Sequence, residues 1–262
     1  MLAVSDLRKS FGGVRAVDGL DLEVREHEIV GLIGPNGAGK TTAFNLITGA
    51  LRPDGGSVRL RGVEVAGFRP HEIARRGLIR SFQVPRIFER MTVLENMLLA
   101  ARDRSDTHLL HTLVAPREAR MRESRSAAEA MERLERFGLD HLAQEFAGVL
   151  SGGQRKLLGL ARALMAEPTL LLLDEPAAGV NPALAGEIAA RLLGLRAEGI
   201  TLLVVEHNLG FLGQIADRVV VMAEGQVLTE GSMAEVRRHH EVLEAYLGRS
   251  TTAGAASVES PI

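Results

Sequence analysis

The chain has 262 residues, of which 46% are hydrophobic and 24% charged, as is usual for a globular protein of one large domain or two small ones. Its formal net charge of −2 gives no sign of nucleic-acid binding, and the absence of cysteine excludes disulfides and thiolate metal sites and fits a reducing compartment. No apolar run approaches the roughly 20 residues of a membrane span, and the N-terminus lacks signal-peptide features. We therefore expect a protein that is soluble or peripheral to a membrane.

The predicted strands fall into two groups. Residues 1–25 and 56–65 alternate apolar and polar side chains, which predicts a half-exposed antiparallel side sheet. Three short apolar segments, 28–34, 168–175 and 199–207, predict buried strands, and a helical pattern follows each of them. Strands that alternate with helices in this way indicate a mainly parallel sheet with helices on both faces.

The middle of the chain has a different pattern, with no convincing strand between about 92 and 166 and a long, charged amphipathic helix within that stretch. We interpret this region as an all-helical insertion in an α/β core. The tail is small and polar, which predicts disorder. The expected division is a core of 1–83 and 164–237, a helical subdomain 84–163 and a C-terminal helix 238–247, together one domain of 1–249 followed by a tail of 250–262.

Residues 34–42, GPNGAGKTT, match the phosphate-loop pattern G-x-x-x-x-G-K-[ST], directly after a predicted strand and before a helix. Such glycines let backbone N–H groups converge on phosphate oxygens at a helix N-terminus. Lys40, one of only three lysines, is placed to reach the β- and γ-phosphates, and the Thr41 hydroxyl to bind Mg²⁺. The competing interpretation is a glycine-rich turn with a surface lysine. The predicted nucleotide-binding residues are Gly34, Pro35, Asn36, Gly37, Ala38, Gly39, Lys40, Thr41 and Thr42.

The segment LLLLDEP, residues 170–176, is a buried strand that ends in two adjacent carboxylates. Successive side chains of a strand point to opposite faces, so the two carboxylates are expected to serve different roles. Asp174 is the expected Mg²⁺ partner, and Glu175 is then free to face an attacking water. By itself, such a pair is more often just a solvated strand end.

The segment SGGQ, residues 151–154, precedes a second helix and predicts a second cradle of backbone N–H groups. One nucleotide does not need two such cradles from one chain. An ordinary serine N-cap explains Ser151, but on this interpretation it does not explain Gly152, Gly153 and Gln154 together.

Together, these three motifs resemble the ATP-binding subunits of ABC transporters, and the resemblance extends from about residue 2 to 247. It implies an α/β fold with a P-loop NTPase core, a mainly parallel sheet, an antiparallel side sheet and an inserted all-helical subdomain. It also implies an ATPase dimer, homodimeric or heterodimeric, in which two chains lie head to tail. Ser151, Gly152, Gly153 and Gln154 of one chain would then close over the ATP of the other, so an isolated monomer should hydrolyse ATP poorly.

The same resemblance assigns further residues. Phe11 takes the place of the aromatic that stacks on adenine, with a core phenylalanine as the alternative, and His207 that of the histidine that contacts the γ-phosphate. Gln83 matches the glutamine that senses Mg²⁺ and water. Asn181 stands where many relatives have aspartate, which puts its role across the dimer interface in doubt. The implied reaction is in-line attack of water on the γ-phosphate of Mg·ATP, with Glu175 polarising the water.

Three longer stretches, RSFQVPRIFERMTVLENMLLA, DEPAAGVNP and EVLEAYLG, resemble the LivG-type ATPases of branched-chain amino acid importers. This implies separate permease subunits, an extracytoplasmic solute-binding protein that acts through the permease, and a peripheral position on the cytoplasmic face of the cell membrane. Urea or amide importers and lipopolysaccharide-type lipid exporters are the alternatives. ABC ATPases that act on DNA or ribosomes are disfavoured, because the insertion is too short for a coiled coil and there is one set of motifs. A GTPase is disfavoured because N-K-x-D is absent.

The stretch that follows Gln83 is predicted to meet the permease. Ile87, Phe88 and Met91 form an apolar patch between two arginines, with packing inside the insertion as the alternative. Thr92 and Glu95 have capping-box spacing, which predicts a helix start at this point.

Overall fold

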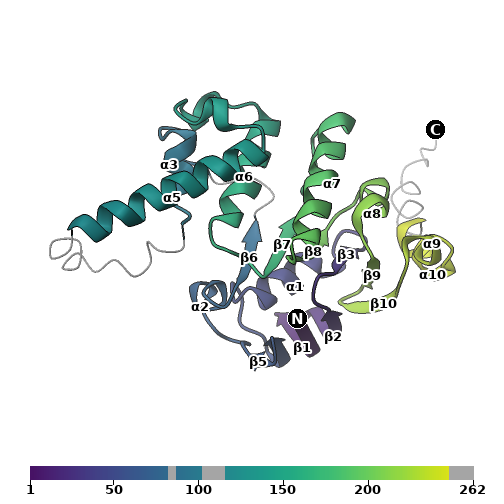
Figure 1. The fold of residues 1–262 in the computed structure, drawn as a ribbon. Coiled ribbons are helices and arrows are strands. Elements are labelled where there is room, and N and C mark those ends of the chain that lie inside the picture. The colour runs from purple at the N-terminus through teal and green to yellow at the C-terminus, as the bar shows by residue number, and fades with distance from the viewer. Residues whose placement is uncertain (82–86, 102–115, 248–262) are drawn as a thin grey trace, which may run out of the picture.

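The computed structural model describes residues 1–81, 87–101 and 116–247, and its strands form two sheets (Figure 1). The smaller sheet has the order β2-β1-β4-β5 and is antiparallel. Its strands are β1 (Leu2–Phe11), β2 (Val14–Val24), β4 (Gly55–Leu60) and β5 (Val63–Glu64). The alternating pattern of the sequence therefore predicted this side sheet correctly.

The larger sheet has the order β10-β9-β3-β8-β7-β6, and all of its neighbouring strands are parallel except the β9–β10 pair. Its strands are β3 (Ile29–Ile33), β6 (Leu78–Ser81), β7 (Leu170–Asp174), β8 (Thr201–Val205), β9 (Arg218–Ala223) and β10 (Gln226–Gly231). β3, β7 and β8 are the three predicted buried strands. Since β3 and β7 both lie beside β8, their carboxyl ends meet at one edge of the sheet.

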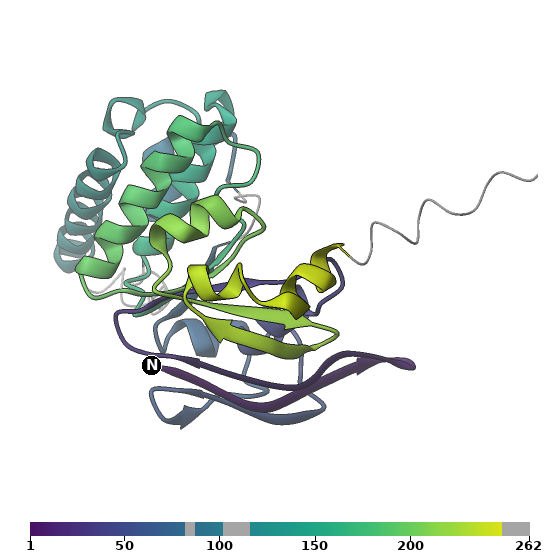
Figure 2. The same cartoon turned by 90° about the vertical axis from the view of Figure 1, so that its right-hand side faces the viewer.

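Helices cover both faces of the larger sheet (Figures 1 and 2). α1 (Lys40–Ile47) lies between the two sheets and shares their apolar core. α6 (Gly152–Leu164), α7 (Pro182–Ala197) and α8 (Leu209–Ile215) pack on the opposite face. The remaining helices are α2 (Pro70–Ala74), α3 (Val93–Leu98), α5 (Pro116–Arg136), α9 (Met233–Val236), α10 (His240–Leu247) and the short 3₁₀ turns η2 (Asp140–Leu142) and η3 (Ala147–Val149).

The fold class is as predicted, an α/β core with a helical insertion, and the insertion lies between β6 and β7 in the chain. Thr92 and Glu95 form the predicted capping box at the start of α3, with Glu95 N–H donating to Thr92 Oγ1 at 3.1 Å and Thr92 N–H to Glu95 Oε2 at 2.7 Å. Within the described ranges, no helix is both long enough and apolar enough to cross a membrane. The proposed tail, 250–262, lies outside the described residues.

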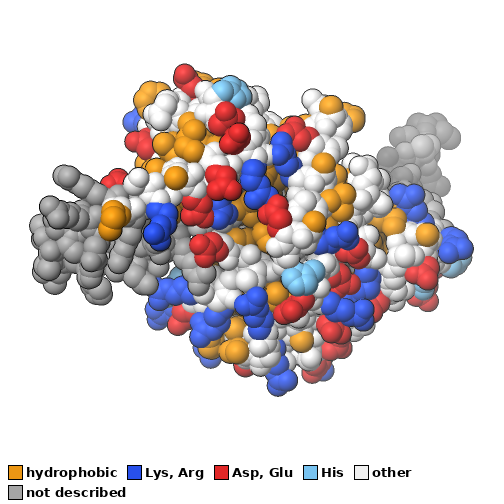
Figure 3. All heavy atoms as spheres, in the orientation of Figure 1, with side chains coloured by type: hydrophobic (Ala, Val, Ile, Leu, Met, Phe, Trp, Pro, Cys, Tyr) orange, Lys and Arg blue, Asp and Glu red, His pale blue; other side chains and the backbone are white. Residues whose placement is uncertain are grey.

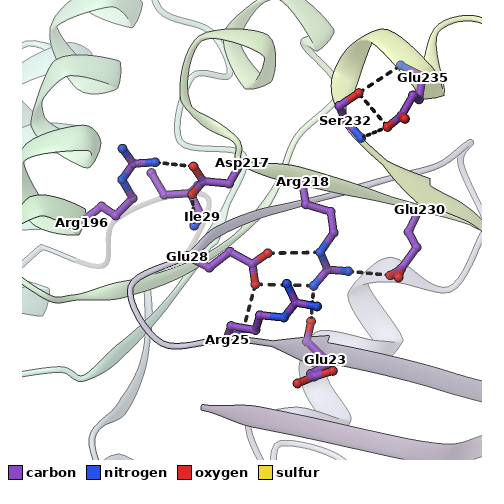
Figure 4. A network of polar contacts seen from close by, with 10 residues as sticks. All are labelled: Glu23, Arg25, Glu28, Ile29, Arg196, Asp217, Arg218, Glu230, Ser232 and Glu235. Atoms are coloured by element: carbon purple, nitrogen blue, oxygen red, sulfur yellow. Dashed lines mark hydrogen bonds and ion pairs between the residues drawn. The ribbon is translucent and has the colours of Figure 1, made fainter.

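The hairpin of β9 and β10 was not predicted, and it occupies one end of the larger sheet. Arg218 ties it to both sheets, because its guanidinium pairs with Glu28 (3.1 Å) just before β3, with Glu230 (2.5 Å) on β10 and with the Glu23 carbonyl (2.6 Å) on β2 (Figure 4). The Arg218 and Glu28 side chains are both largely buried, so this pair is less screened by solvent than a surface ion pair. The hairpin is therefore held in a fixed place beside β3.

Candidate active site

The phosphate loop connects β3 to α1, as the sequence predicted. Gly39 is the N-cap of α1, with φ of +98°, and Gly37 has φ of +84°, both in the left-handed region that glycine adopts at low cost. The Ala38 N–H donates to the Pro35 carbonyl at 3.1 Å, which closes the turn. Asn36 and Gly37 are exposed at its tip, and Thr41 is exposed on the first turn of α1 while Thr42 is half-buried.

Other parts of the backbone approach this loop so closely that two of its positions have no room for a side chain. A Cβ added to Gly34 would lie 2.2 Å from the Met222 carbonyl oxygen of β9, and one added to Gly39 would lie 2.3 Å from the Ala16 carbonyl oxygen of β2. The Gly225 N–H, from the turn between β9 and β10, donates to the Ala38 carbonyl at 3.1 Å. The unpredicted hairpin is thus one wall of the phosphate loop.

Lys40 is buried, and its ammonium group donates to the carbonyls of Gly34 (2.7 Å) and Pro35 (3.0 Å) in its own loop. Burial lowers the pKa of Lys40 below its usual value, and the charges of Glu175 and Asp174 oppose this shift. The lysine and the two carboxylates at the end of β7 are therefore close enough to interact electrostatically.

Asp174, the last residue of β7, pairs with Arg80 of the neighbouring strand β6, with 2.8 Å between Asp174 Oδ2 and Arg80 Nη2. Both side chains are largely buried. The hydroxyl of Thr41 and the carboxylate of Asp174 are hard oxygen ligands of the kind that Mg²⁺ binds together with substrate phosphates, so the donor set fits Mg²⁺. No group of three or more His, Cys, Asp or Glu side chains is placed to hold a metal within the described ranges.

Glu175 faces the other way, toward the end of β8, where the His207 Nε2 atom lies 3.1 Å from Glu175 Oε1. Its backbone has φ of +49°, an uncommon conformation for a residue with a side chain, and its N–H donates to the Val205 carbonyl at 2.9 Å. The structure therefore brings together two predicted catalytic residues that follow the ends of different strands. The third, Gln83, lies outside the described residues.

Ser151 is the N-cap of α6 and forms a capping box with Gln154. The Gln154 N–H donates to Ser151 Oγ at 3.3 Å, and the Ser151 N–H donates to Gln154 Oε1 at 2.9 Å. The capping box accounts for Ser151 and Gln154 but not for the two glycines between them, so the role of the whole segment stays a prediction. Gly153 lies against Leu184 of α7, but a Cβ added to Gly152 would meet nothing within 4 Å.

Two further predicted positions have clear local settings. Phe11 ends β1 with 49% of its surface exposed, and Lys9 Nζ lies 5.8 Å from its ring centroid, so it is not a core phenylalanine. Asn181 is the N-cap of α7, where its Oδ1 accepts from the Leu184 N–H at 2.8 Å. Asparagine and aspartate cap helices about equally well, so the departure at this position is compatible with the local fold.

Sequence reasoning missed three charged residues at the site: Arg80, Lys156 and Glu206. Lys156 donates to backbone carbonyls of the segment after β7, and Glu206 is buried at the end of β8. The only signals in the sequence were the scarcity of lysine and a glutamate at the end of the apolar run TLLVV. Neither signal indicates which distant residue is the partner.

Comparison with known proteins agrees with this geometry. Residues 17–178 match the ABC transporter family, and residues 226–251 match the family described as branched-chain amino acid ATP-binding cassette transporter. The branched-chain amino acid transport ATP-binding protein BraF of Pseudomonas aeruginosa is 41% identical over 95% of this chain and 98% of its own length. LivG of Escherichia coli K12 is 39% identical with the same coverage.

The solved structures that resemble this chain are also ATP-binding cassettes of ABC transporters. The ADP conformation of MJ1267, an ATP-binding cassette of an ABC transporter, aligns with a TM-score of 0.82 and 37% identity over 95% of this chain and 98% of that one. The dimeric structure of MJ0796, a bacterial ABC transporter cassette, aligns with a TM-score of 0.76 and 25% identity over 89% of this chain and 99% of that one. The chain belongs to the ABC transporter family. It is an ATP-binding subunit whose ATP hydrolysis is coupled to transport.

Proposed function

We propose that this chain powers the import of branched-chain amino acids through separate permease subunits. The observation that best supports ATP hydrolysis is the pairing of Glu175 with His207 at the sheet edge where the phosphate loop also lies. Import of branched-chain amino acids is supported by relatives of that description, which match nearly from end to end, and by the specific match of residues 226–251. No residue of the ATPase is proposed to touch the transported solute.

Hydrolysis requires each residue to act at a defined place. Lys40 and the N–H groups of the phosphate loop bind the phosphates, and Thr41, Asp174 and Gln83 would hold Mg²⁺. When bound, Mg²⁺ offsets the negative charge of the phosphates. Glu175 accepts a hydrogen bond from the attacking water and His207 contacts the γ-phosphate, so the pair orients the nucleophile in line.

The proposed active form is a head-to-tail dimer of ATPase subunits, with itself or with a related chain. The exposed N-terminus of α6 supports this, because Ser151 and Gly152 present a helix N-terminus to the surface. The segment 151–154 would close over the ATP of the partner subunit, and Phe11 would stack on adenine in its own site. A dimeric cassette among the related structures is in keeping with this arrangement.

The proposed permease-docking surface is centred on Phe88 and includes two more exposed apolar side chains, Phe146 and Val149. Hydrogen bonds from Ala147 N–H to the Met91 carbonyl (2.9 Å) and from Gly148 N–H to the Glu89 carbonyl (3.0 Å) join the two segments that carry them. Apolar side chains also reach the surface around α3 in Figure 3. We infer peripheral attachment to the cytoplasmic face of the membrane, with a solute-binding protein acting on the outer side of the permease.

The backbone of this surface is fixed from within. Asn96 of α3 is fully buried, accepts from the Phe88 N–H at 2.8 Å, and donates to the carbonyls of Phe88 (3.0 Å) and Thr92 (2.9 Å). Phe88, whose backbone is held in this way, is 53% exposed. Ile87, by contrast, packs against the core, so the alternative of packing within the insertion applies to it. An exposed aromatic on a fixed backbone is suited to anchor a partner helix.

The chemistry is tested with Glu175→Gln in the full-length chain assembled with its permease. Because the amide cannot accept the proton of the attacking water, hydrolysis should fall by about a hundredfold or more while ATP still binds. Lys40→Ala is the contrasting variant and should weaken binding of an ATP analogue itself. Turnover and equilibrium binding are measured in parallel. Hydrolysis by Glu175→Gln at close to the wild-type rate would remove Glu175 from this role.

The transport function is tested by uptake of radiolabelled leucine into vesicles that contain the assembled transporter. Phe88→Asp should reduce uptake at least about tenfold, because a buried charge opposes docking, while ATP hydrolysis by the isolated subunit stays within about twofold. Val63→Asp, at an apolar residue of similar exposure on β5, is the control and should leave uptake unchanged. Uptake of urea or an amide in place of leucine would overturn the proposed solute but not the ATPase.

A further inference from the structure

The four residues that follow β7, Glu175 to Ala178, form a segment whose carbonyl groups converge on one lysine of another helix. The Lys156 ammonium group, from α6, donates to the carbonyls of Glu175 (3.3 Å), Pro176 (3.2 Å) and Ala178. Lys156 is half-buried. An ammonium group has three donor hydrogens, so these three carbonyls can employ all of them.

A buried carboxylate approaches the same segment from β8. Glu206 is only 2% exposed, and its Oε1 accepts from the Ala177 N–H at 2.7 Å. Its Oε2 accepts from the N–H groups of His207 (3.0 Å) and Asn208 (3.3 Å). One carboxylate thus joins the segment after β7 to the residues that carry the His207 side chain.

Lys156 and Glu206 contact the backbone next to Glu175, whose conformation needs stabilising contacts. Glu175 has φ of +49°, and holding a residue with a side chain in the left-handed region costs about 1 kcal/mol or more. That conformation persists only where surrounding contacts determine it, and here Lys156 and Glu206 engage consecutive peptide groups of the segment. In this backbone conformation, Glu175 Oε1 lies 3.1 Å from His207 Nε2.

We propose that Lys156 and Glu206 are positioning residues for the hydrolysis step, which hold the backbone of the Glu175 to Ala178 segment so that the Glu175 carboxylate faces His207. The proposal rests on the proposed role of Glu175. It also connects two sites, because Lys156 lies on the helix whose N-terminus is proposed to meet the nucleotide of the partner subunit. A shift of α6 on closure of that site would thereby reach the Glu175 backbone.

A role in packing alone explains this lysine less well. Burial lowers the pKa of Lys156 below its usual value, and the negative charges of Glu206 and Glu175 oppose that shift. Keeping the ammonium group charged therefore lowers the stability of the folded state, and an apolar side chain in this position would not have this cost. The neighbours Leu157 and Leu158 on the same helix are fully or nearly fully buried apolar side chains.

The experiment compares Lys156→Met, Lys156→Arg and Glu206→Gln in the full-length chain assembled with its permease. Lys156→Met should lower kcat at least about tenfold, because a misplacement of about 1 Å at a reacting group is costly, while the Kd for an ATP analogue stays within about threefold. Lys156→Arg keeps a charged donor and should recover at least about a third of the lost turnover. Arg59→Met removes one positive charge at an exposed position of β4 and should leave kcat unchanged.

Several results would overturn the proposal. If Lys156→Met retains kcat within about threefold, Lys156 does not position Glu175. If Lys156→Met fails to fold, Glu206→Gln decides, because it keeps the shape of the side chain and should still lower kcat at least about fivefold; turnover within twofold of wild type would reject the idea. Failure of the proposed function itself is seen separately, as absence of ATP hydrolysis in the wild type or its persistence in Glu175→Gln.

Discussion

Two glycine-containing loops precede helices in this molecule, and they differ in what surrounds them. In the phosphate loop, residues 34–42, the backbones of β9 and β2 lie where the side chains of Gly34 and Gly39 would be, and Gly37 and Gly39 have left-handed conformations. In the segment 151–154, Gly152 has no neighbour within 4 Å of an added Cβ. The first loop needs glycine because of its own fold, while the second has no such need at Gly152.

This difference indicates where the ligand of each loop comes from. The phosphate loop has its shape set by β2, β9 and the β9–β10 turn, so it is a preformed site for the chain's own nucleotide. In the segment 151–154 the capping box holds Ser151 and Gln154, and Gly153 lies against Leu184 of α7. Gly152 alone is open, and it leaves room for an approach from outside the chain. That arrangement favours the head-to-tail dimer, in which the ligand of this segment belongs to the partner subunit.

The largest effect is expected for Gly39→Ala. Its Cβ would lie 2.3 Å from the Ala16 carbonyl oxygen in a backbone with φ of +98°, so either the loop or β2 must shift. The free energy of unfolding should fall by about 3 kcal/mol, from overlap and backbone strain together. Urea unfolding measures this directly. A variant within about 0.5 kcal/mol of wild type would show that the loop relaxes easily and that the proposed contrast in rigidity is wrong.

The converse is expected for Gly152→Ala. Because the added methyl meets nothing in its own chain, the free energy of unfolding should stay within about 0.5 kcal/mol of wild type. ATP hydrolysis by the assembled transporter should nevertheless fall about tenfold or more, since the methyl would stand between the loop and the partner's nucleotide. Turnover of the complex and urea unfolding are measured on the same preparation. Unchanged turnover would place the partner's nucleotide elsewhere.

The sequence was sufficient for what local pattern determines. The strand, loop and helix around residues 34–42 follow from one continuous apolar run, a glycine-rich motif and a helical pattern, and the structure has them in that order. Strand alternation also predicted that the two adjacent carboxylates face different ways, although Glu175 lies just past β7 and has φ of +49°. Asp174 indeed meets β6 and Glu175 meets the end of β8.

What the sequence could not give are contacts between distant segments. Met222 touches the phosphate loop from a strand far along the chain, and Arg80 pairs with Asp174 across 94 positions. β10 was missed because it is only partly buried and carries no strong alternation, whereas β9 was overlooked although it is a short buried apolar run like the three predicted strands. Propensity and motif do not encode such pairings, which depend on the assembled sheet.

The smallest expected effect concerns the lysines of the two helices. Lys40 of α1 turns back to its own loop, whereas Lys156 of α6 reaches the segment after β7, and burial lowers the pKa of both. For Lys156 the cost of the charge is present in full below its folded pKa. It disappears as pH rises toward the usual value of 10.5, because the unfolded chain then holds more protons than the folded one.

Wild type should therefore gain stability relative to Lys156→Met between neutral and alkaline pH, by a few tenths of a kcal/mol once solvent screening of this half-exposed group is allowed for. Urea unfolding of both proteins across this range measures the difference. Turnover should move in the opposite direction, since a neutral amine facing Glu175, Glu206 and three carbonyls has fewer hydrogens to donate. If stability and turnover of the wild type rose together with pH, the Lys156 charge would have no part in holding Glu175. If stability rises and turnover falls with pH in the wild type, and neither trend appears in Lys156→Met, then Lys156 acts by positioning Glu175 and not by packing alone.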